Sequence, residues 1–186
     1  MSKRVCPWWL GYLLASPVRK WLQQDPAEIL APYVREGMTV LEPGPGMGFF
    51  TLELARLVGP SGRVLAVDVQ PKMIAGLKRR AANAGLLGRI DARVVAADSM
   101  GVKDLAGKVD FTLAFALVHE MPDSGHFFSE AAEALKPGAC LLLAEPSGHV
   151  NGDEFAAELQ DAANAGLIVV DRPTIARSQT ALLKKT

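Results

Sequence analysis

The stretch TVLEPGPGMGFF, residues 39–50, decides the fold of this 186-residue chain. It begins with a short apolar run typical of a buried strand and continues into a turn that contains Gly44, Gly46 and Gly48. Apolar residues then recur at helical spacing over 50–58. A strand that leads through a glycine turn into a helix is the first unit of an α/β sheet and indicates a ligand site at the turn.

The rest of the chain repeats this alternation. Further strands are predicted at 63–67, 90–96, 111–115, 139–144, 167–170 and 177–183, and helices at 26–31, 71–85, 128–135 and 153–165. This order predicts one α/β domain over 26–186, a doubly wound and mostly parallel sheet with helices on both faces. The last two strands have no helix between them, so we expect the final strand to be antiparallel.

Composition limits the classes of function. Twenty basic and twenty acidic residues give zero net charge, which argues against a broad nucleic-acid-binding face. No apolar run is long enough to cross a membrane, and the apolar segment after Lys3 and Arg4 is a poor secretory signal because it contains Pro7 and two tryptophans. Two cysteines fit a reducing compartment. We therefore expect a cytoplasmic protein.

The spacing of the glycines separates two kinds of ligand. A dinucleotide fold requires G-x-G-x-x-G, whereas this turn reads G-x-G-x-G, and a nucleoside triphosphate loop of the form G-x-x-x-x-G-K-[ST] is absent from the sequence. Glu42 precedes the first glycine by two residues. Its carboxylate would repel a diphosphate but could orient a ligand that carries an ammonium group.

Two further acids follow successive predicted strands. Asp68 comes 20 residues after Gly48, where a carboxylate can accept hydrogen bonds from both hydroxyls of a ribose. Asp98 follows the third strand and could accept from an exocyclic amine such as that of adenine. A single such acid could be only a helix cap or a loop charge. Three acids after successive strands, with Glu42 included, favour a nucleoside site.

Five segments of the sequence resemble those of a known family. The segments EPGPGMG (42–48), AVDV (66–69), AADS (96–99), DFTLAF (110–115) and LKPGACLLLAEP (135–146) look like class I S-adenosylmethionine-dependent methyltransferases. More narrowly, they are similar to the small bacterial enzymes grouped with quinone-biosynthesis C-methyltransferases. The resemblance implies a Rossmann-like seven-stranded sheet with a reversed final hairpin, and S-adenosylmethionine as the cofactor.

The resemblance also implies roles for single residues. Glu42 and the glycine turn would hold the methionyl portion, Asp68 would bind the ribose and Val69 would pack on the adenine. Asp98 and Ser99 would meet the adenine edge. The full set of expected cofactor-binding residues is Glu42, Gly44, Gly46, Gly48, Asp68, Val69, Asp98, Ser99 and Phe115.

The catalytic candidates follow the fourth and fifth predicted strands: His119, Glu145 and His149. Direct displacement needs a base only if the acceptor must lose a proton, and an unperturbed histidine pKa near 6.5 suits that role. Each of them could instead be structural. The sequence lacks the acidic set of magnesium-dependent catechol methyltransferases, since Glu145 and Pro146 occupy the fifth strand end, so no metal is expected.

The leading functional hypothesis is an active methyltransferase for a small, apolar or aromatic acceptor. A cofactor-binding subunit that is inactive without a partner protein is the alternative, and a nicotinamide oxidoreductase is disfavoured by the glycine spacing. The Trp-rich lead-in, residues 1–25, could form a lid over the cofactor or pack at a sheet edge or homodimer interface. We expect neither a nucleic-acid partner nor a membrane span.

Overall fold

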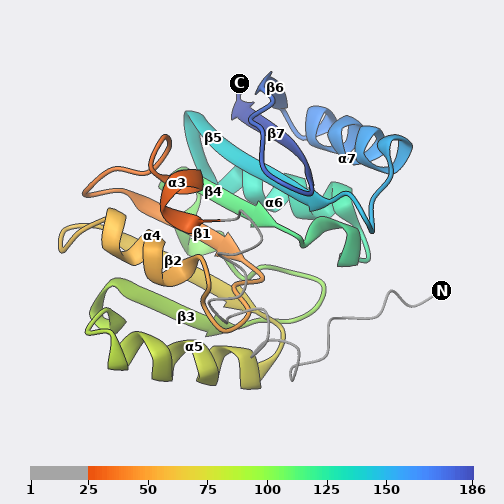
Figure 1. The fold of residues 1–186 in the computed structure, drawn as a ribbon. Coiled ribbons are helices and arrows are strands. Elements are labelled where there is room, and N and C mark those ends of the chain that lie inside the picture. Colours follow the sequence, from red (N-terminus) through yellow and green to blue (C-terminus); the bar gives the residue numbers. More distant parts are fainter. Residues whose placement is uncertain (1–24) are drawn as a thin grey trace. The chain divides into compact units, whose positions relative to one another are not determined.

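A computed structural model describes residues 25–186 of the chain (Figure 1). Almost all of the predicted lead-in, and with it the predicted lid, lies outside the described residues. The seven strands follow the order β3-β2-β1-β4-β5-β7-β6 in one sheet. This order confirms the predicted Rossmann-like, mostly parallel α/β fold. The described chain divides into two compact units, residues 25–97 and residues 98–186.

The unit 25–97 is built on three parallel strands. These strands are β1 (Thr39–Pro43), β2 (Arg63–Asp68) and β3 (Ile90–Val94), and the helices are α3 (Pro26–Leu30), α4 (Thr51–Leu57), α5 (Pro71–Asn83) and the 3-10 turn η1 (Leu87–Arg89). Both α4 and α5 pack against β2. Four consecutive residues of β2, from Val64 to Val67, are buried, so both of its faces are covered.

The unit 98–186 contains the mixed half of the sheet. Its elements are η2 (Lys103–Leu105), β4 (Val109–Phe115), η3 (Val118–Glu120), α6 (Ser124–Ala134), β5 (Leu135–Pro146), α7 (Gly152–Asn164), β6 (Leu167–Asp171) and β7 (Ser178–Lys185). Strands β4 and β5 are parallel, whereas β7 runs antiparallel to both β5 and β6. The predicted reversal of the final strand is therefore confirmed.

Each strand differs from the prediction by one or two residues at one end or both, and β5 also begins four residues earlier than predicted. The third strand ends at Val94 rather than at residue 96. Strand β5 begins at Leu135, where the sequence predicted the end of a helix, and it contains Pro137 and Gly138. Between the pairs Val109–Leu135 and Phe111–Cys140, β4 contains one residue and β5 contains four, so this segment is a bulge. Proline and a positive-φ glycine are tolerated in a bulge because the ladder is interrupted there.

The core of each unit lies between its helices and its strands. Phe111, Phe127 and Phe128 are the largest fully buried side chains of the unit 98–186, and Leu41, Leu54 and Leu77 are fully buried in the unit 25–97. Within residues 25–186, no helix is both long and apolar enough to span a membrane.

Candidate functional site

The glycine turn after β1 needs backbone angles that other residues adopt with strain. Gly44, Gly46 and Gly48 have φ of 66°, 54° and 85°. The Gly44 N–H donates to the carbonyl of Val67 at 2.8 Å, which ties the turn to the end of β2. The Gly48 N–H donates to the carbonyl of Pro45 at 2.9 Å and closes the turn on itself. The sequence prediction of a tight glycine turn is confirmed.

Helix α5 packs against this turn. A Cβ atom on Gly48 would lie 2.4 Å from Cδ1 of Leu77, so a larger residue at this position would displace this buried side chain. Arg80, one turn further along α5, donates from Nη1 to the carbonyl of Met47 at 2.6 Å. The role of Arg80 could not be predicted, since nothing in a helical sequence marks which arginine reaches a loop 33 residues earlier.

These contacts predict a difference between two glycine variants. Gly48→Ala and Gly46→Ala both place an alanine at positive φ, which costs about 1–2 kcal/mol. Beyond its chain neighbours, a Cβ atom on Gly46 would meet nothing within 4 Å, whereas one on Gly48 would meet Leu77. We therefore expect Gly48→Ala to be less stable than Gly46→Ala by about 1 kcal/mol in urea denaturation. Equal midpoints would contradict close packing of the turn on α5.

Glu42, the fourth residue of β1, carries a buried carboxylate next to the turn. Its side chain is 4% exposed, and no donor among residues 25–186 hydrogen-bonds its Oε2 atom. The pKa of Glu42 is raised to about 7, mainly by burial and to a smaller extent by the nearby charge of Asp68. The Thr51 hydroxyl lies close enough to lower the pKa in part, although its geometry falls short of a hydrogen bond. A buried carboxylate oxygen without a donor requires an explanation, and a cationic ligand at this position would supply one.

Asp68 is the last residue of β2 and is 9% exposed. Its Oδ1 atom accepts the backbone N–H of Gln70 at 2.8 Å, which fixes the carboxylate just before α5 begins. Val69 follows it and is 38% exposed, so its side chain offers an apolar surface. The structure therefore brings Glu42, the glycine turn, Asp68 and Val69 together at the carboxyl ends of β1 and β2, as the sequence predicted.

Asp98 and Ser99 lie in the loop that opens the unit 98–186. Asp98 is exposed in a turn, while the Ser99 hydroxyl donates to Oε1 of Glu130 at 2.6 Å. Oε2 of the same glutamate accepts the Met100 N–H at 2.7 Å. Glu130, on α6, thus holds the loop by both carboxylate oxygens. No sequence pattern marks this residue, because its partners lie about 30 positions away.

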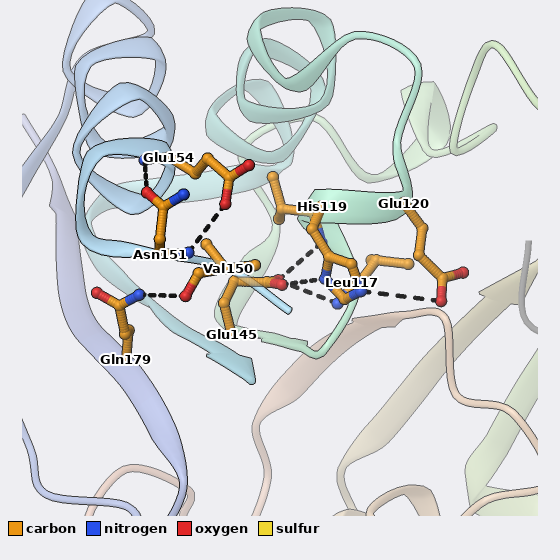
Figure 2. A network of polar contacts seen from close by, with 9 residues as sticks. Leu117, His119, Glu120, Glu145, Val150, Asn151, Glu154 and Gln179 are labelled. Carbon is orange, nitrogen blue, oxygen red and sulfur yellow. Dashed lines mark hydrogen bonds and ion pairs between the residues drawn. The ribbon is translucent and has the colours of Figure 1, made fainter. Parts of the chain in front are cut away.

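His119 and Glu145 form the polar centre at the ends of β4 and β5 (Figure 2). Glu145 is completely buried, and its Oε1 atom accepts the N–H groups of Leu117 at 3.0 Å and Val118 at 2.8 Å. Its Oε2 atom contacts Nδ1 of His119. This carboxylate therefore joins the chain after β4 to the end of β5.

The surroundings of His119 are acidic and aromatic. Its Nε2 atom lies 4.0 Å from Oε1 of Glu120 in η3, and its ring centroid lies 5.7 Å from that of His149 in an edge-to-face arrangement. The hydrogen bond and charge of Glu145 raise the pKa of His119, with smaller contributions from Glu120 and from Glu158 on α7, while burial opposes them. The three predicted catalytic residues thus lie in one cluster, and Phe115, partly exposed, ends the strand that leads to it.

Residues 25–186 contain no group of three or more His, Cys, Asp or Glu side chains close enough together to hold a metal ion. The cluster of His119, Glu145 and His149 can transfer protons, since it pairs a histidine with a buried carboxylate.

The sequence of this chain is similar to those of known proteins. A family model described as a methyltransferase domain matches residues 34–181. The ubiquinone/menaquinone biosynthesis C-methyltransferase UbiE of Pasteurella multocida is 30% identical over 112 residues, which are 60% of this chain and 41% of that protein. The protein of the same name from Pseudoalteromonas translucida is 31% identical over 127 residues, which are 68% of this chain and 49% of that protein. This chain therefore spans less than half the length of these relatives.

Among solved structures, a SAM-dependent methyltransferase from Aquifex aeolicus is similar with a TM-score of 0.84 and 23% identity. The match covers 97% of this chain and 98% of that chain. At this level of identity the likeness supports the fold, which agrees with the strand order above.

Proposed function

Because this chain belongs to the methyltransferase domain family, we propose that it transfers a methyl group from S-adenosylmethionine to a small organic acceptor. The observation that carries the proposal is Glu42, a buried carboxylate next to a glycine turn, with one oxygen that no donor in the described part of the chain reaches. A ligand that brings an ammonium group would supply the missing donor. S-adenosylmethionine carries such a group on its methionyl portion.

The residues of the unit 25–97 fit the rest of this cofactor. Asp68 would accept hydrogen bonds from the ribose hydroxyls, and Val69 would pack on the adenine. The turn has no Cβ at Gly44, Gly46 or Gly48, so its backbone can approach a ligand closely. In the unit 98–186 we assign Asp98, Ser99 and Phe115 to the same cofactor. The hydrogen bond from the Ser99 hydroxyl to Glu130 would fix the loop that carries Asp98.

The cofactor would supply a methyl group activated by a positively charged sulfur. The contribution of the protein is then to bind and orient the reactants, which can be worth effective molarities on the order of 10⁵ to 10⁸ M. Ionised Glu42 and Asp68 would favour the positively charged methyl donor over its neutral-sulfur product by charge. No metal takes part in this proposal.

The acceptor that we propose is small and apolar or aromatic. The names of the curated relatives, which concern ubiquinone and menaquinone biosynthesis, support an acceptor of this kind. The balance of 20 basic and 20 acidic residues supports a protein that does not methylate nucleic acid. A cytoplasmic location and a homodimer remain predictions.

Transfer of label from methyl-labelled S-adenosylmethionine tests the proposed function. The purified chain alone should label a component of the small-molecule fraction of a cell extract. Label that appears only after a second protein is added would favour the partner-dependent subunit instead. Label on RNA or on protein, with none on small molecules, would contradict the proposed acceptor class.

Glu130 provides a test of the loop that carries Asp98. Glu130→Gln leaves one acceptor but removes the charge that holds Ser99 and Met100, so the loop should loosen. We expect S-adenosylhomocysteine to bind about 3- to 10-fold more weakly. Hydrogen bonds to a charged group contribute about 1.5–3 kcal/mol, and only part of the stability that the loop loses is lost from the free energy of ligand binding. Calorimetric titration measures the effect, and the exposed Glu133→Gln on the same helix is the control.

A further inference from the structure

We propose that His119 and Glu145 form a proton-accepting dyad, so that the methyl acceptor is a compound whose reacting oxygen or carbon carries an acidic proton. In this dyad His119 takes the proton, and Glu145 is a positioning residue that does not touch the acceptor. The inference rests on the proposed methyl transfer and adds the class of acceptor to it.

The carboxylate of Glu145 is buried and bound by other residues of the unit 98–186. Its side chain has no exposed surface, Oε1 accepts the N–H groups of Leu117 and Val118, and Oε2 contacts His119 (Figure 2). Because this carboxylate is completely buried, neither of its oxygens is accessible to an acceptor molecule. Its function is therefore to hold the η3 turn and the imidazole in place.

The two ring nitrogens of His119 differ in what they can do. An ionised carboxylate only accepts hydrogen bonds, so the contact with Oε2 of Glu145 requires a proton on Nδ1 of His119. In the neutral ring the lone pair then lies on Nε2. This nitrogen is 4.0 Å from Oε1 of Glu120, which is longer than a hydrogen bond, and the side chain of His119 is 20% exposed. Nε2 is therefore the nitrogen that can take a proton from another molecule.

The charge around the ring favours its protonated form. Glu145 from β5, Glu120 from η3 and Glu158 from α7 all raise the pKa of His119, and they would stabilise the imidazolium that forms when the ring accepts a proton. His149 contacts the ring edge-to-face, and on α6 Nε2 of His126 lies 3.8 Å from Oε2 of Glu130. The neutral form that can act as a base becomes more populated as the pH rises through this raised pKa.

The backbone before η3 is strained. Ala116 has a φ of 53°, which is unfavourable for a residue with a Cβ, and its N–H donates to the carbonyl of Ala144 at 2.7 Å. Strain of this kind persists only where the surrounding contacts over-determine the backbone conformation. Here it turns the chain sharply after β4 and brings His119 onto Glu145.

Atoms and electrons balance in the proposed step. The acceptor O–H or C–H bond breaks, its proton goes to Nε2 of His119, and its electron pair forms the bond to the methyl carbon. The bond between that carbon and sulfur breaks, and its electrons stay on sulfur, so that S-adenosylhomocysteine is the second product. The imidazolium of His119 then returns its proton to water. Phenols, enols and activated carbon acids fit this step, whereas thioethers and tertiary amines have no proton to give.

The experiment compares His119→Gln and Glu145→Gln with the control Glu133→Gln, which changes an exposed residue of α6. Methyl-labelled S-adenosylmethionine and the small-molecule fraction of a cell extract are the reactants. We expect turnover by His119→Gln to fall by about 10²- to 10⁴-fold, while S-adenosylhomocysteine affinity stays within about twofold. For Glu145→Gln, turnover should fall and the lower limb of the pH–rate profile should move to lower pH. Unchanged turnover in His119→Gln would overturn the dyad.

Two further readouts keep the inference separate from the proposed function. Nitrogen NMR of the His119 ring in the wild-type protein should show the proton of the neutral form on Nδ1, and a proton on Nε2 would overturn the dyad even without turnover. Mass spectrometry should find the transferred methyl on oxygen or carbon, and a methylated thioether or tertiary amine would overturn the acceptor class. Failure of wild-type protein to bind S-adenosylhomocysteine would instead count against the proposed function.

Discussion

Replacing Glu42 with glutamine is expected to stabilise the ligand-free protein by up to about 3 kcal/mol at pH 8. Burial raises the pKa of this carboxyl from 4.5 to about 7, so the native state holds the proton more tightly than the unfolded state does. Stability contributed by this group is therefore present below pH 4.5 and is lost as the pH rises towards 7. A difference of this size in pKa corresponds to about 3 kcal/mol. Glutamine is never charged and avoids the loss.

The same variant should bind S-adenosylmethionine about 10- to 100-fold more weakly, because a charged hydrogen bond contributes about 1.5–3 kcal/mol. Wild-type affinity should rise with pH up to about 7, where Glu42 ionises, and the affinity of Glu42→Gln should not. Urea denaturation at pH 5 and pH 8, together with calorimetric titration, measures both effects. Glu53→Gln, which breaks the exposed ion pair with Arg56, is the control and should change neither by more than about 0.5 kcal/mol. A variant that is less stable at pH 8 would contradict the account.

Replacing Asp68 with asparagine is expected to weaken S-adenosylhomocysteine binding by about 10- to 150-fold. Asparagine can still accept the Gln70 N–H that Oδ1 of Asp68 accepts now, so the start of α5 should be preserved. What is lost is the charge of the group that would accept from the ribose hydroxyls, which contributes about 1.5–3 kcal/mol. The charge of Asp68 also raises the pKa of Glu42, so this pKa should fall in the variant.

Asp91→Asn is the matched control for this experiment. Asp91 lies on β3 opposite Leu65, three residues before the end of β2, and its carboxylate is held by Arg63 and Arg93. Its loss should leave the binding constant within error. Equal loss of affinity in both variants, or none in either, would contradict a specific role of Asp68 in ribose binding.

The fold could be predicted because its strands are marked by local sequence. Buried runs such as 139–144 and the glycine turn after β1 identify a sheet covered on both faces, and the missing helix between β6 and β7 identifies their antiparallel pairing. The start of β5 could not be predicted. Pro137 and Gly138 usually end elements, and only the pairing of Leu135 with Val109 shows that they lie inside a bulge.

The candidate site could be predicted only where its residues follow strand ends. Glu42, Asp68 and the glycines were found from their order along the chain, since parallel strands bring their ends to one edge. Arg80 and Glu130 were not found, because each is a helical residue whose partner is a loop about 30 positions away. The sequence named His119 and Glu145 separately, but only the contact between Nδ1 and Oε2 relates them as a pair.

Calorimetric titration of the purified wild-type chain with S-adenosylhomocysteine, and in parallel with NAD, tests the central claim most directly. We expect saturable one-to-one binding of S-adenosylhomocysteine that is lost in Glu42→Gln combined with Asp68→Asn, and no heat from NAD. Saturable binding of NAD together with no binding of S-adenosylhomocysteine would contradict the assignment of the glycine turn and its two carboxylates.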